Sequence, residues 1–510
     1  MNKDLKNIKA ALLKSRAEQA AKRSVEVDES QVRNSDIVND NYLGLYSKGM
    51  THDATTMVCD ESRIKELQLA LETGRQSDFD DLDKAGARKQ ASPQGSLGLE
   101  LSGGDPEGFS MPEASALNSR KTAAEMVEVY AKHLLRDKPF KDYEDGSPEI
   151  ASAINALNAF GADFEGPKDG GVVTAKTLFR GSAEGCTVGG YISQLFLHTI
   201  GVGNFAYEPQ GPTKTGVYGI TKANYVDIQN GNVPVAQTVD AVLKYMFNGR
   251  QLGSTVHIDL VFQHFYEAAA VLLNAGVGRN AGFPSPVNEG AFLTMGGPVE
   301  LTTGIAEVAR HALKAAWVQK WRKHLRLRPE ACAARVVAEL DGDLQTGTVH
   351  PDLKNSSVIA DISALNLANG GESKPFLPLQ YAEGSPTHPA YPAGHATISG
   401  ACATLLKIYL ADGLWSSTGL AERQATADGL GVEAYAGADA GTTTIHYEIN
   451  KLASNVALGR DFAGVHYRSD SELALGEKVA IQYYKDSKDL QNEAIGDITF
   501  NKFDGTPITL

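Results

Sequence analysis

Hydrophobic residues recur at helical spacing through most of the chain, and long polar or Gly/Pro-rich connections separate the helical segments. In the first half, this pattern predicts helices over residues 61–74, 121–136, 148–159, 188–200, 235–247 and 254–274. In the second half, it predicts helices over residues 305–327, 329–339, 396–410, 420–430, 448–458 and 471–484. Strand signals are few and short, so the sequence predicts an all-α fold of two helical bundles with long loops.

The length of the chain sets its expected domain organisation. Its 510 residues exceed the roughly 250–300 at which a single hydrophobic core stops growing. We therefore expect an N-terminal bundle over residues 1–300 and a C-terminal bundle over residues 301–510. All the motifs described below follow residue 316, so the second bundle is expected to hold the active site. The first is expected to support it and to form subunit contacts.

The most distinctive stretch of the sequence is SPTHPAYPAGH, residues 385–395. His388 and His395 flank a turn that leads directly into the helix predicted over residues 396–410. The first turn of such a helix presents unpaired N–H groups and the positive end of the helix dipole. Gly394 lets an anion approach the backbone, and His395 can exchange a proton near neutral pH. The stretch predicts an oxyanion site, although a Pro/Gly-rich loop with two surface histidines would explain it equally well.

A second segment, WVQKWRKHLRLRP at residues 317–329, concentrates positive charge. Five cations fall between Lys320 and Arg328 with no acid among them, in a chain whose formal net charge is −14. A solvated basic helix face is the ordinary explanation of such a run. However, Trp317 and Trp321 interleave with the cations, which favours a binding role.

The third segment is LGRDFAGVHYRSD, residues 458–470. A helix end followed by a turn could bring Arg460 and His466 to one point. Asp470 lies four residues after His466 and could hold one ring nitrogen, leaving the other free to bind an electrophilic centre. Alternatively, Asp470 or Ser469 is the N-cap of the next helix, and both roles can hold at once.

Together the three segments read Lys-x7-Arg-Pro, Pro-Ala-Gly-His and Gly-Arg-x5-His-x3-Asp. This set resembles the vanadium-dependent haloperoxidases, in particular the bromoperoxidases of algae and cyanobacteria. It is more distantly similar to the acid phosphatase and type 2 phosphatidic acid phosphatase superfamily, which uses the same kind of anion cradle. Residues 43–53 and 179–194 also look like bromoperoxidase segments, so the resemblance extends from about residue 40 to about residue 485.

The resemblance implies that vanadate is the cofactor and that His466 binds its vanadium, with Asp470 behind the imidazole. The residues that it implies as hydrogen-bond donors to the vanadate oxygens are Lys320, Arg328, Gly394 and Arg460. It implies His395 as the main acid–base group, with Lys320 and His388 also taking part in catalysis. Trp317 and His388 would line the halide side of the pocket.

One position departs from the family pattern. Ala393 stands where the usual Pro-Ser-Gly-His motif has a serine whose hydroxyl commonly touches vanadate. A neutral hydrogen bond contributes roughly 0.5–1.5 kcal/mol, whereas each of three charge-assisted bonds contributes roughly 1.5–3 kcal/mol. We therefore expect the alanine to weaken cofactor binding only modestly.

The activity implied by the resemblance is the oxidation of bromide and iodide by hydrogen peroxide to hypohalous acid, which halogenates small organic acceptors. Two alternatives remain open. In a soluble acid phosphatase, His466 would accept a phosphoryl group and His395 would protonate the leaving alcohol. An inactive anion-binding assembly protein would also fit the acidic composition, although such a scaffold has no need of both histidines.

Composition narrows the set of partners. A net charge of −14 and a pI near 5.4 argue against nucleic acid. Residues 185–207 lack formal charge but are interrupted too often by polar residues and glycine to form a membrane span. The resemblance implies a homo-oligomer, from a dimer to a dodecamer.

Two further expectations concern location and a second metal. Residues 1–23 carry seven cations and no unbroken apolar core, so no signal peptide is visible. We expect a soluble and by default cytoplasmic protein, with export by another route left open. Asn288 and Glu289, in a Gly/Pro-rich joint, are candidate oxygen ligands for a structural calcium ion.

Overall fold

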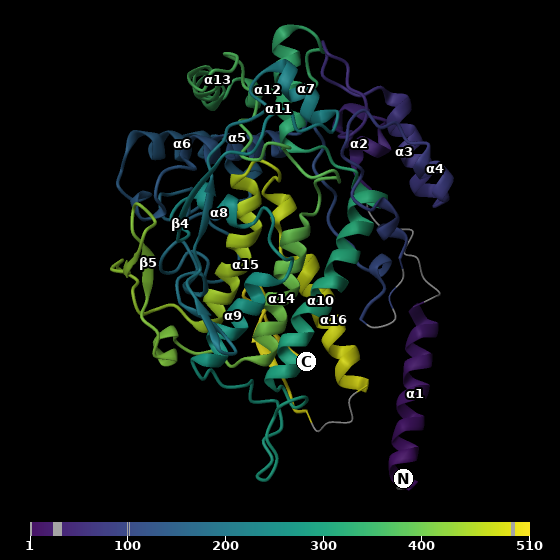
Figure 1. Ribbon diagram of the computed structural model, residues 1–510, viewed down its shortest axis with the longest axis vertical. Coiled ribbons are helices and arrows are strands. Elements are labelled where there is room, and N and C mark those ends of the chain that lie inside the picture. The colour runs from purple at the N-terminus through teal and green to yellow at the C-terminus, as the bar shows by residue number, and fades with distance from the viewer. Residues whose placement is uncertain (1–2, 24–32, 99, 101–102, 491–494) are drawn as a thin grey trace.

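Helices dominate the computed structural model, which describes residues 3–23, 33–98, 100, 103–490 and 495–510 (Figure 1). The helices of the first half are α1 Lys3–Arg23, α2 Ser35–Val38, α3 Glu61–Thr73, α4 Gln76–Asp80, α5 Arg120–Leu135, α6 Pro148–Asn158, α7 Lys222–Gln229, α8 Gly249–Thr255 and α9 Gln263–Asn274. Those of the second half are α10 Pro298–Val318, α11 Pro329–Asp341, α12 Pro351–Lys354, α13 Val358–Ala368, α14 Gly394–Tyr409, α15 Ile445–Phe462 and α16 Ala474–Leu490. The prediction of an all-α class is confirmed.

The strands are short and form antiparallel pairs. They are β1 Ile200–Val202 with β2 Phe205–Tyr207, β3 Gly211–Lys214 with β4 Val239–Lys244, β5 Arg423–Ala425 with β6 Val432–Ala434, and β7 Thr499–Asn501 with β8 Pro507–Thr509. Two helix predictions were wrong here, because residues 235–247 contain β4 and residues 420–430 contain β5. The valines of β4 suit a strand, and its pairing with β3 decides the outcome over apolar spacing that also fits a helix.

Three other helix predictions failed at turns or loops. The single helix predicted over residues 254–274 is interrupted at residues 256–262, between α8 and α9. Residues 188–200 contain only a short 3-10 turn, Gln194–Phe196, because Gly189 and Gly190 interrupt the segment. The single helix predicted over 305–327 ends at Val318 and continues as a π-helical turn, Gln319–His324. Such turns occur frequently at functional sites, and this one contains one of the candidate site residues.

Helices α10, α14, α15 and α16 pack along one another in the middle of the molecule (Figure 1). Helix α14 is buried along almost its whole length. Small residues let it approach α16 closely: a Cβ at Gly400 would collide with the carbonyl of Leu473, and one at Gly476 with the carbonyl of Thr397. This packing fixes the N-terminus of α14, where the candidate site lies.

One cluster of buried hydrophobic residues includes side chains from Met111 to Phe503. The division into bundles at residue 300 stays a prediction. In the part of the chain that the structure describes, no helix is both long enough and apolar enough to cross a membrane.

Candidate functional site

The three motif segments meet at the N-terminus of α14. Lys320 lies in the π-helical turn, and its ammonium donates to the carbonyl oxygens of Pro389 (2.8 Å) and Ala390 (2.9 Å). The guanidinium of Arg328, just before α11, donates to the carbonyl of Val465 (2.6 Å). The basic segment is therefore hydrogen-bonded to both of the others.

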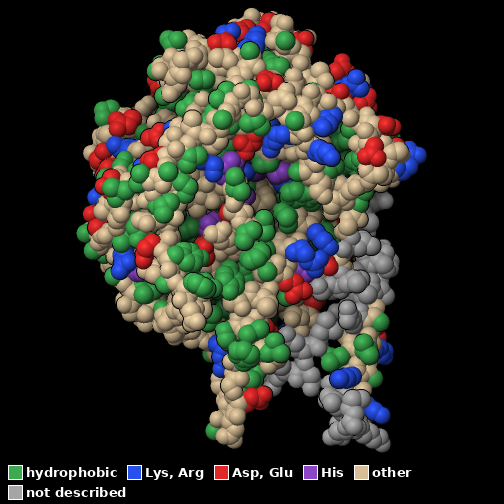
Figure 2. Space-filling model, in the orientation of Figure 1, with side chains coloured by type: hydrophobic (Ala, Val, Ile, Leu, Met, Phe, Trp, Pro, Cys, Tyr) green, Lys and Arg blue, Asp and Glu red, His purple; other side chains and the backbone are tan. Residues whose placement is uncertain are grey.

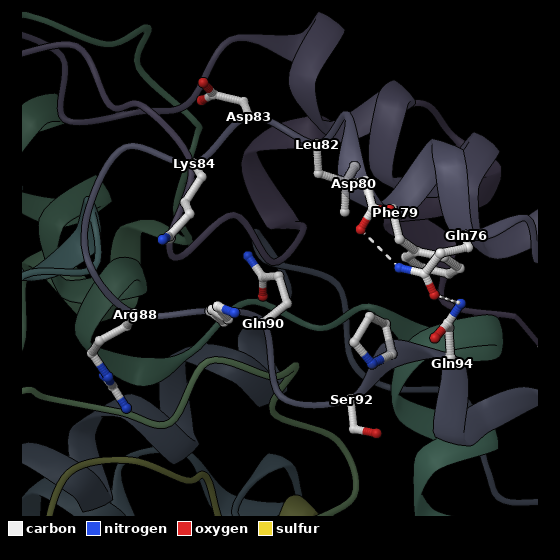
Figure 3. A pocket seen from close by; sticks show the side chains of 13 residues that line it. Gln76, Phe79, Asp80, Leu82, Asp83, Lys84, Arg88, Gln90, Ser92 and Gln94 are labelled. Atoms are coloured by element: carbon white, nitrogen blue, oxygen red, sulfur yellow. Dashed lines mark hydrogen bonds between the residues drawn. The ribbon is translucent and has the colours of Figure 1, made fainter.

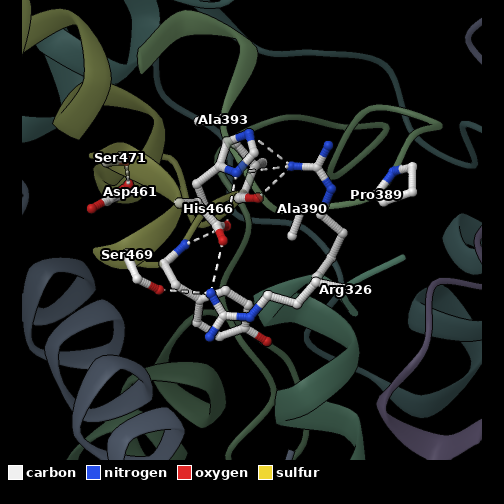
Figure 4. Close-up of polar contacts among 12 residues, drawn as sticks. Arg326, Pro389, Ala390, Ala393, Asp461, His466, Ser469 and Ser471 are labelled. Atoms are coloured by element: carbon white, nitrogen blue, oxygen red, sulfur yellow. Dashed lines mark hydrogen bonds and ion pairs between the residues drawn. The ribbon is translucent and has the colours of Figure 1, made fainter. Parts of the chain in front are cut away.

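His466 lies in this meeting point with its two ring nitrogens in different environments (Figure 4). Nδ1 lies 2.9 Å from Oδ2 of Asp470, and Nε2 lies 2.9 Å from a guanidinium nitrogen of Arg328. An arginine can only donate, so Nε2 is the acceptor and Nδ1 carries the proton that Asp470 accepts. Burial lowers the pKa of His466 well below its usual value, and Arg328 and Lys320 lower it further. The imidazole is neutral, the state in which histidine binds a metal.

Asp470 is held by contacts that sequence analysis did not identify. Arg326 donates to its Oδ1 (2.8 Å), and the backbone N–H of Tyr467 donates to its Oδ2 (3.0 Å). Arg326 also donates to Glu125 on α5 (2.6 Å), and its guanidinium lies over the ring of Tyr467 at 4.0 Å. These contacts fix the Asp470 carboxylate behind His466. Figure 4 shows the side chains of Arg326 and His466 among these polar contacts. Arg326 belongs to the basic segment at residues 317–329, but its spacing did not predict that it holds Asp470.

Three buried cations converge on His466. Lys320, Arg328 and Arg460 are each at most 3% exposed. Burial, followed by the charge of Arg328, holds the pKa of Lys320 well below its usual value, and burial lowers the pKa of Arg328 to about 10. Arg460 donates to the carbonyl of Val256 (2.7 Å), but its buried Nε has no hydrogen-bond partner among the described residues. Since buried cations need compensation, this cluster is suited to bind an anion.

Backbone N–H groups at the start of α14 add to the positive electrostatic potential of the site. Helix α14 begins at Gly394, and its N-cap, Ala393, makes no side-chain capping bond. The N–H of Ala393 donates to the carbonyl of Asp470 (2.7 Å), which ties the start of the helix to the His466 segment. A Cβ at Gly394 would lie 3.3 Å from a side-chain carbon of Leu313, so an alanine would fit here after a small shift of that side chain. The first-turn N–H groups and the helix dipole favour an anion here.

His395 is joined to a carboxylate that the sequence analysis missed. Its Nε2 lies 2.9 Å from Oδ1 of Asp259, in the loop between α8 and α9; the His395 side chain is 20% exposed and that of Asp259 is 3%. Burial lowers the pKa of His395, and Asp259 opposes that shift. Although burial raises the pKa of Asp259, His395, His264 and Arg460 together hold it at about 2. Asp259 falls within the helix predicted over residues 254–274, which the structure breaks between α8 and α9, and no sequence signal related it to His395.

Trp317 and His388, predicted on the halide side, lie against each other with ring centroids 4.9 Å apart. Nδ1 of His388 lies 3.0 Å from a guanidinium nitrogen of Arg328 and 3.2 Å from the carbonyl oxygen of Pro389; the shorter contact, with an arginine that can only donate, favours the ring proton on Nε2. Burial, with Lys320 and Arg328, lowers the pKa of His388 well below its usual value. The indole N–H of Trp317 donates to the carbonyls of Ala91 (3.2 Å) and Ser92 (3.1 Å). This wall is therefore apolar and carries a neutral imidazole.

Different kinds of side chain surround the site on the surface of the molecule. Figure 2 shows histidine side chains inside a hollow on the viewed face, with lysine and arginine side chains along its upper edge and hydrophobic side chains below. An edge of this composition attracts small anions to the hollow.

The calcium prediction gains no support. Asn288 and Glu289 are both exposed. Over the described residues, no group of three or more His, Cys, Asp or Glu side chains is arranged to hold a metal ion.

Comparisons with known proteins identify close relatives. A family model described as the VCPO second helical-bundle domain matches residues 302–493. A vanadium-dependent bromoperoxidase of Ascophyllum nodosum is 30% identical over 412 residues, covering 77% of this chain and 72% of that protein. One of Corallina pilulifera is 29% identical over 566 residues, covering 93% and 92%. The solved homohexameric structure of the second vanadate-dependent bromoperoxidase of Ascophyllum nodosum superimposes with a TM-score of 0.90 at 26% identity, covering 98% of this chain and 90% of that one.

Proposed function

This chain belongs to the vanadium-dependent haloperoxidases, and we propose that its vanadate is held between His466 and the cations Lys320, Arg328 and Arg460. It is a vanadate-dependent peroxidase that oxidises bromide with hydrogen peroxide. The observation that carries the site proposal is a neutral imidazole whose Nε2 accepts a hydrogen bond from Arg328, next to the buried cations Lys320 and Arg460.

The residues present fit this cofactor. Vanadate is a compact oxyanion, and the cluster offers one ammonium, two guanidinium groups and the N-terminus of α14. The partnerless Nε of Arg460 is a donor that an anion would satisfy. An anion would also raise the depressed pKa of Lys320, since it favours the charged ammonium. When bound, vanadate supplies a Lewis acid that polarises hydrogen peroxide.

The protein's own groups divide the remaining work. His466 would hold the vanadium through Nε2, while Asp470 accepts from its Nδ1–H and sets the ring orientation. The net reaction, H2O2 + Br⁻ + H⁺ → HOBr + H2O, consumes one proton, and His395 is the group placed to deliver it. Asp259 accepts from His395 and stabilises its protonated form. Lys320 supplies positive charge where negative charge develops.

The halide is proposed to approach along the wall formed by Trp317 and His388. The indole of Trp317 and the neutral imidazole of His388 make this wall less polar than a water-filled channel. A less hydrated anion such as bromide or iodide loses less on entering it than chloride does. We extend the activity to iodide on this ground. Small organic acceptors are the expected final substrates, and a homo-oligomer is proposed because the Ascophyllum nodosum structure is a homohexamer.

The comparisons favour the haloperoxidase over the phosphatase and the inactive scaffold. The direct test is to titrate vanadate into metal-free protein with hydrogen peroxide and bromide, and to measure phosphate-ester hydrolysis in parallel. Bromide oxidation is expected to appear in proportion to vanadate. A phosphatase would instead hydrolyse the ester without metal and lose that activity as vanadate is added, and a scaffold would do neither.

Ala393→Ser is expected to tighten vanadate binding. The alanine is fully buried at the start of α14, where a hydroxyl could reach the anion. One neutral hydrogen bond of roughly 0.5–1.5 kcal/mol corresponds to an approximately two- to tenfold lower dissociation constant. The constant is measured by vanadate titration of bromide oxidation. Ala396→Ser, in the same helix, serves as the control, and unchanged affinity in Ala393→Ser would show that position 393 does not face the anion.

A further inference from the structure

A second cavity lies directly behind the halide wall. It has a volume of about 400 Å³, within the roughly 300–1,000 Å³ typical of small-molecule sites, and is lined mainly by residues 76–94 (Figure 3). Nothing in the proposed chemistry of vanadate, peroxide or halide uses this space.

The cavity and the halide side share a single layer of backbone. Ser92 lines the cavity, and its carbonyl, with that of Ala91, accepts from the indole of Trp317. The N–H of Ala91 donates to the carbonyl of Thr387 (2.8 Å), the residue before His388. Ser92 has a φ of 47°, a left-handed conformation that costs energy in a non-glycine residue and that its surroundings must impose. Because the cavity and the halide side share this backbone, a molecule in the cavity would lie next to the position where oxidised halide is expected to be released.

The lining has two chemically different sides. Phe79 and Leu82, both half-buried, lie on one side in Figure 3, and Lys84 and Arg88 lie on the other with Gln90 between. Arg88 is anchored, since its guanidinium donates to the carbonyls of Glu383 and Ser385, 3.2 Å each. No carboxylate within the described ranges forms an ion pair with Lys84.

The two acids of the lining are already engaged. Asp83 accepts from the backbone N–H of Thr51 (2.7 Å), and Asp80 accepts from the side-chain amide of Gln76 (2.8 Å). Three cations, Lys84, Arg88 and Lys89, line the cavity with these two acids, so the lining carries a net positive charge, with Lys84 and Arg88 opposite the ring of Phe79. Such a site suits a ligand with an aromatic body and an anionic group.

We propose that this cavity binds the organic acceptor, and that the preferred acceptor is a phenol or similar electron-rich aromatic carrying a carboxylate. The inference rests on the proposed function, which supplies HOBr. A ring carbon attacks bromine, the O–Br bond breaks, and the ring proton leaves with the oxygen as water: HOBr + Ar–H → Ar–Br + H2O. Binding beside the halide wall places the ring where HOBr emerges, ahead of competing acceptors in solution.

The test is a competition between 4-hydroxyphenylacetate and neutral 4-methylphenol, with bromide and peroxide. The ratio of brominated products is compared with the ratio given by reagent HOBr. The enzyme is expected to enrich the anionic product by at least about threefold, the size of effect expected from one exposed ion pair and partial burial of a ring. Lys84→Ala and Phe79→Ala are expected to return the ratio to that of the reagent. Lys176→Ala, which removes a surface lysine elsewhere, is expected to retain the enrichment.

A product ratio equal to that of reagent HOBr would overturn the proposal, as would enrichment that survives both cavity substitutions. The ratio does not depend on the overall rate, so a partial loss of activity in a variant does not blur it. Calorimetric measurement of 4-hydroxyphenylacetate binding distinguishes a failure of the cavity proposal from a failure of the proposed haloperoxidase function. If tribromide formation without any organic acceptor were absent while Lys84-dependent binding remained, the haloperoxidase function would be wrong and the ligand site right.

Discussion

His466→Ala is expected to abolish vanadate-dependent bromide oxidation. Of the four groups that we place around the vanadate, His466 offers a ring-nitrogen lone pair, whereas Lys320, Arg328 and Arg460 serve as hydrogen-bond donors. Loss of a partner behind a metal ligand typically costs about 10–100-fold in affinity or activity, so loss of the ligand itself should exceed about 100-fold. Both bromide oxidation and the vanadium retained per chain after gel filtration should fall.

His446→Ala is the matched control. His446 is also a buried imidazole, hydrogen-bonded to the carbonyl of Leu410 (3.0 Å) at the other end of α15. Its removal is expected to cost stability but not vanadate binding. Full bromide oxidation by His466→Ala would make the ligand assignment wrong, even though the family assignment would stand. Retained vanadium with lost activity would assign His466 a role in turnover rather than in binding.

The parts of the structure that could be predicted are those that depend on neighbouring residues. Helices α5 and α11 begin and end within about two residues of prediction, because apolar spacing and capping are local properties. The three motifs could be recognised because each fits within thirteen residues. Their meeting at the start of α14 was an expectation drawn from resemblance, and the observed contacts of Lys320 and Arg328 agree with it.

What could not be predicted depends on residues far apart in the sequence. Strand β4 forms because residues 211–214 pair with it, and no local pattern records that partner. Asp259 is 136 residues from His395 and lies in the loop that interrupts the helix predicted over residues 254–274. Arg326 shares a dense basic run with four other cations, and only its position between Glu125 and Asp470 distinguishes it. The groups that orient the predicted histidines are thus brought into place by long-range packing.

Asp259→Asn is expected to lower kcat roughly 100-fold, the lower end of what general acid–base catalysis contributes. With its pKa held at about 2, Asp259 is anionic at every working pH, so it stabilises protonated His395 throughout. Asparagine removes that stabilisation, and the pKa of His395 falls further. Since the reaction needs a proton from His395, the pH profile of kcat should shift to lower pH. The profile is measured with saturating vanadate and peroxide.

The direction of that shift distinguishes proton delivery from simple positioning. If Asp259 only orients the His395 ring, asparagine should change kcat little and equally at all pH values, because its amide oxygen can still accept from the imidazole. If His395 acts as a base, the acidic limb of the profile should move to lower pH, because a lower pKa keeps the ring neutral over a wider range; if it delivers a proton, the alkaline limb should move instead. Asp412→Asn, at the His446 pair, is the control for loss of a carboxylate beside histidine and should leave the profile unchanged. A shift of the alkaline limb to lower pH, confined to Asp259→Asn, is the outcome that the 2.9 Å contact and the charge of Asp259 require for proton delivery by His395.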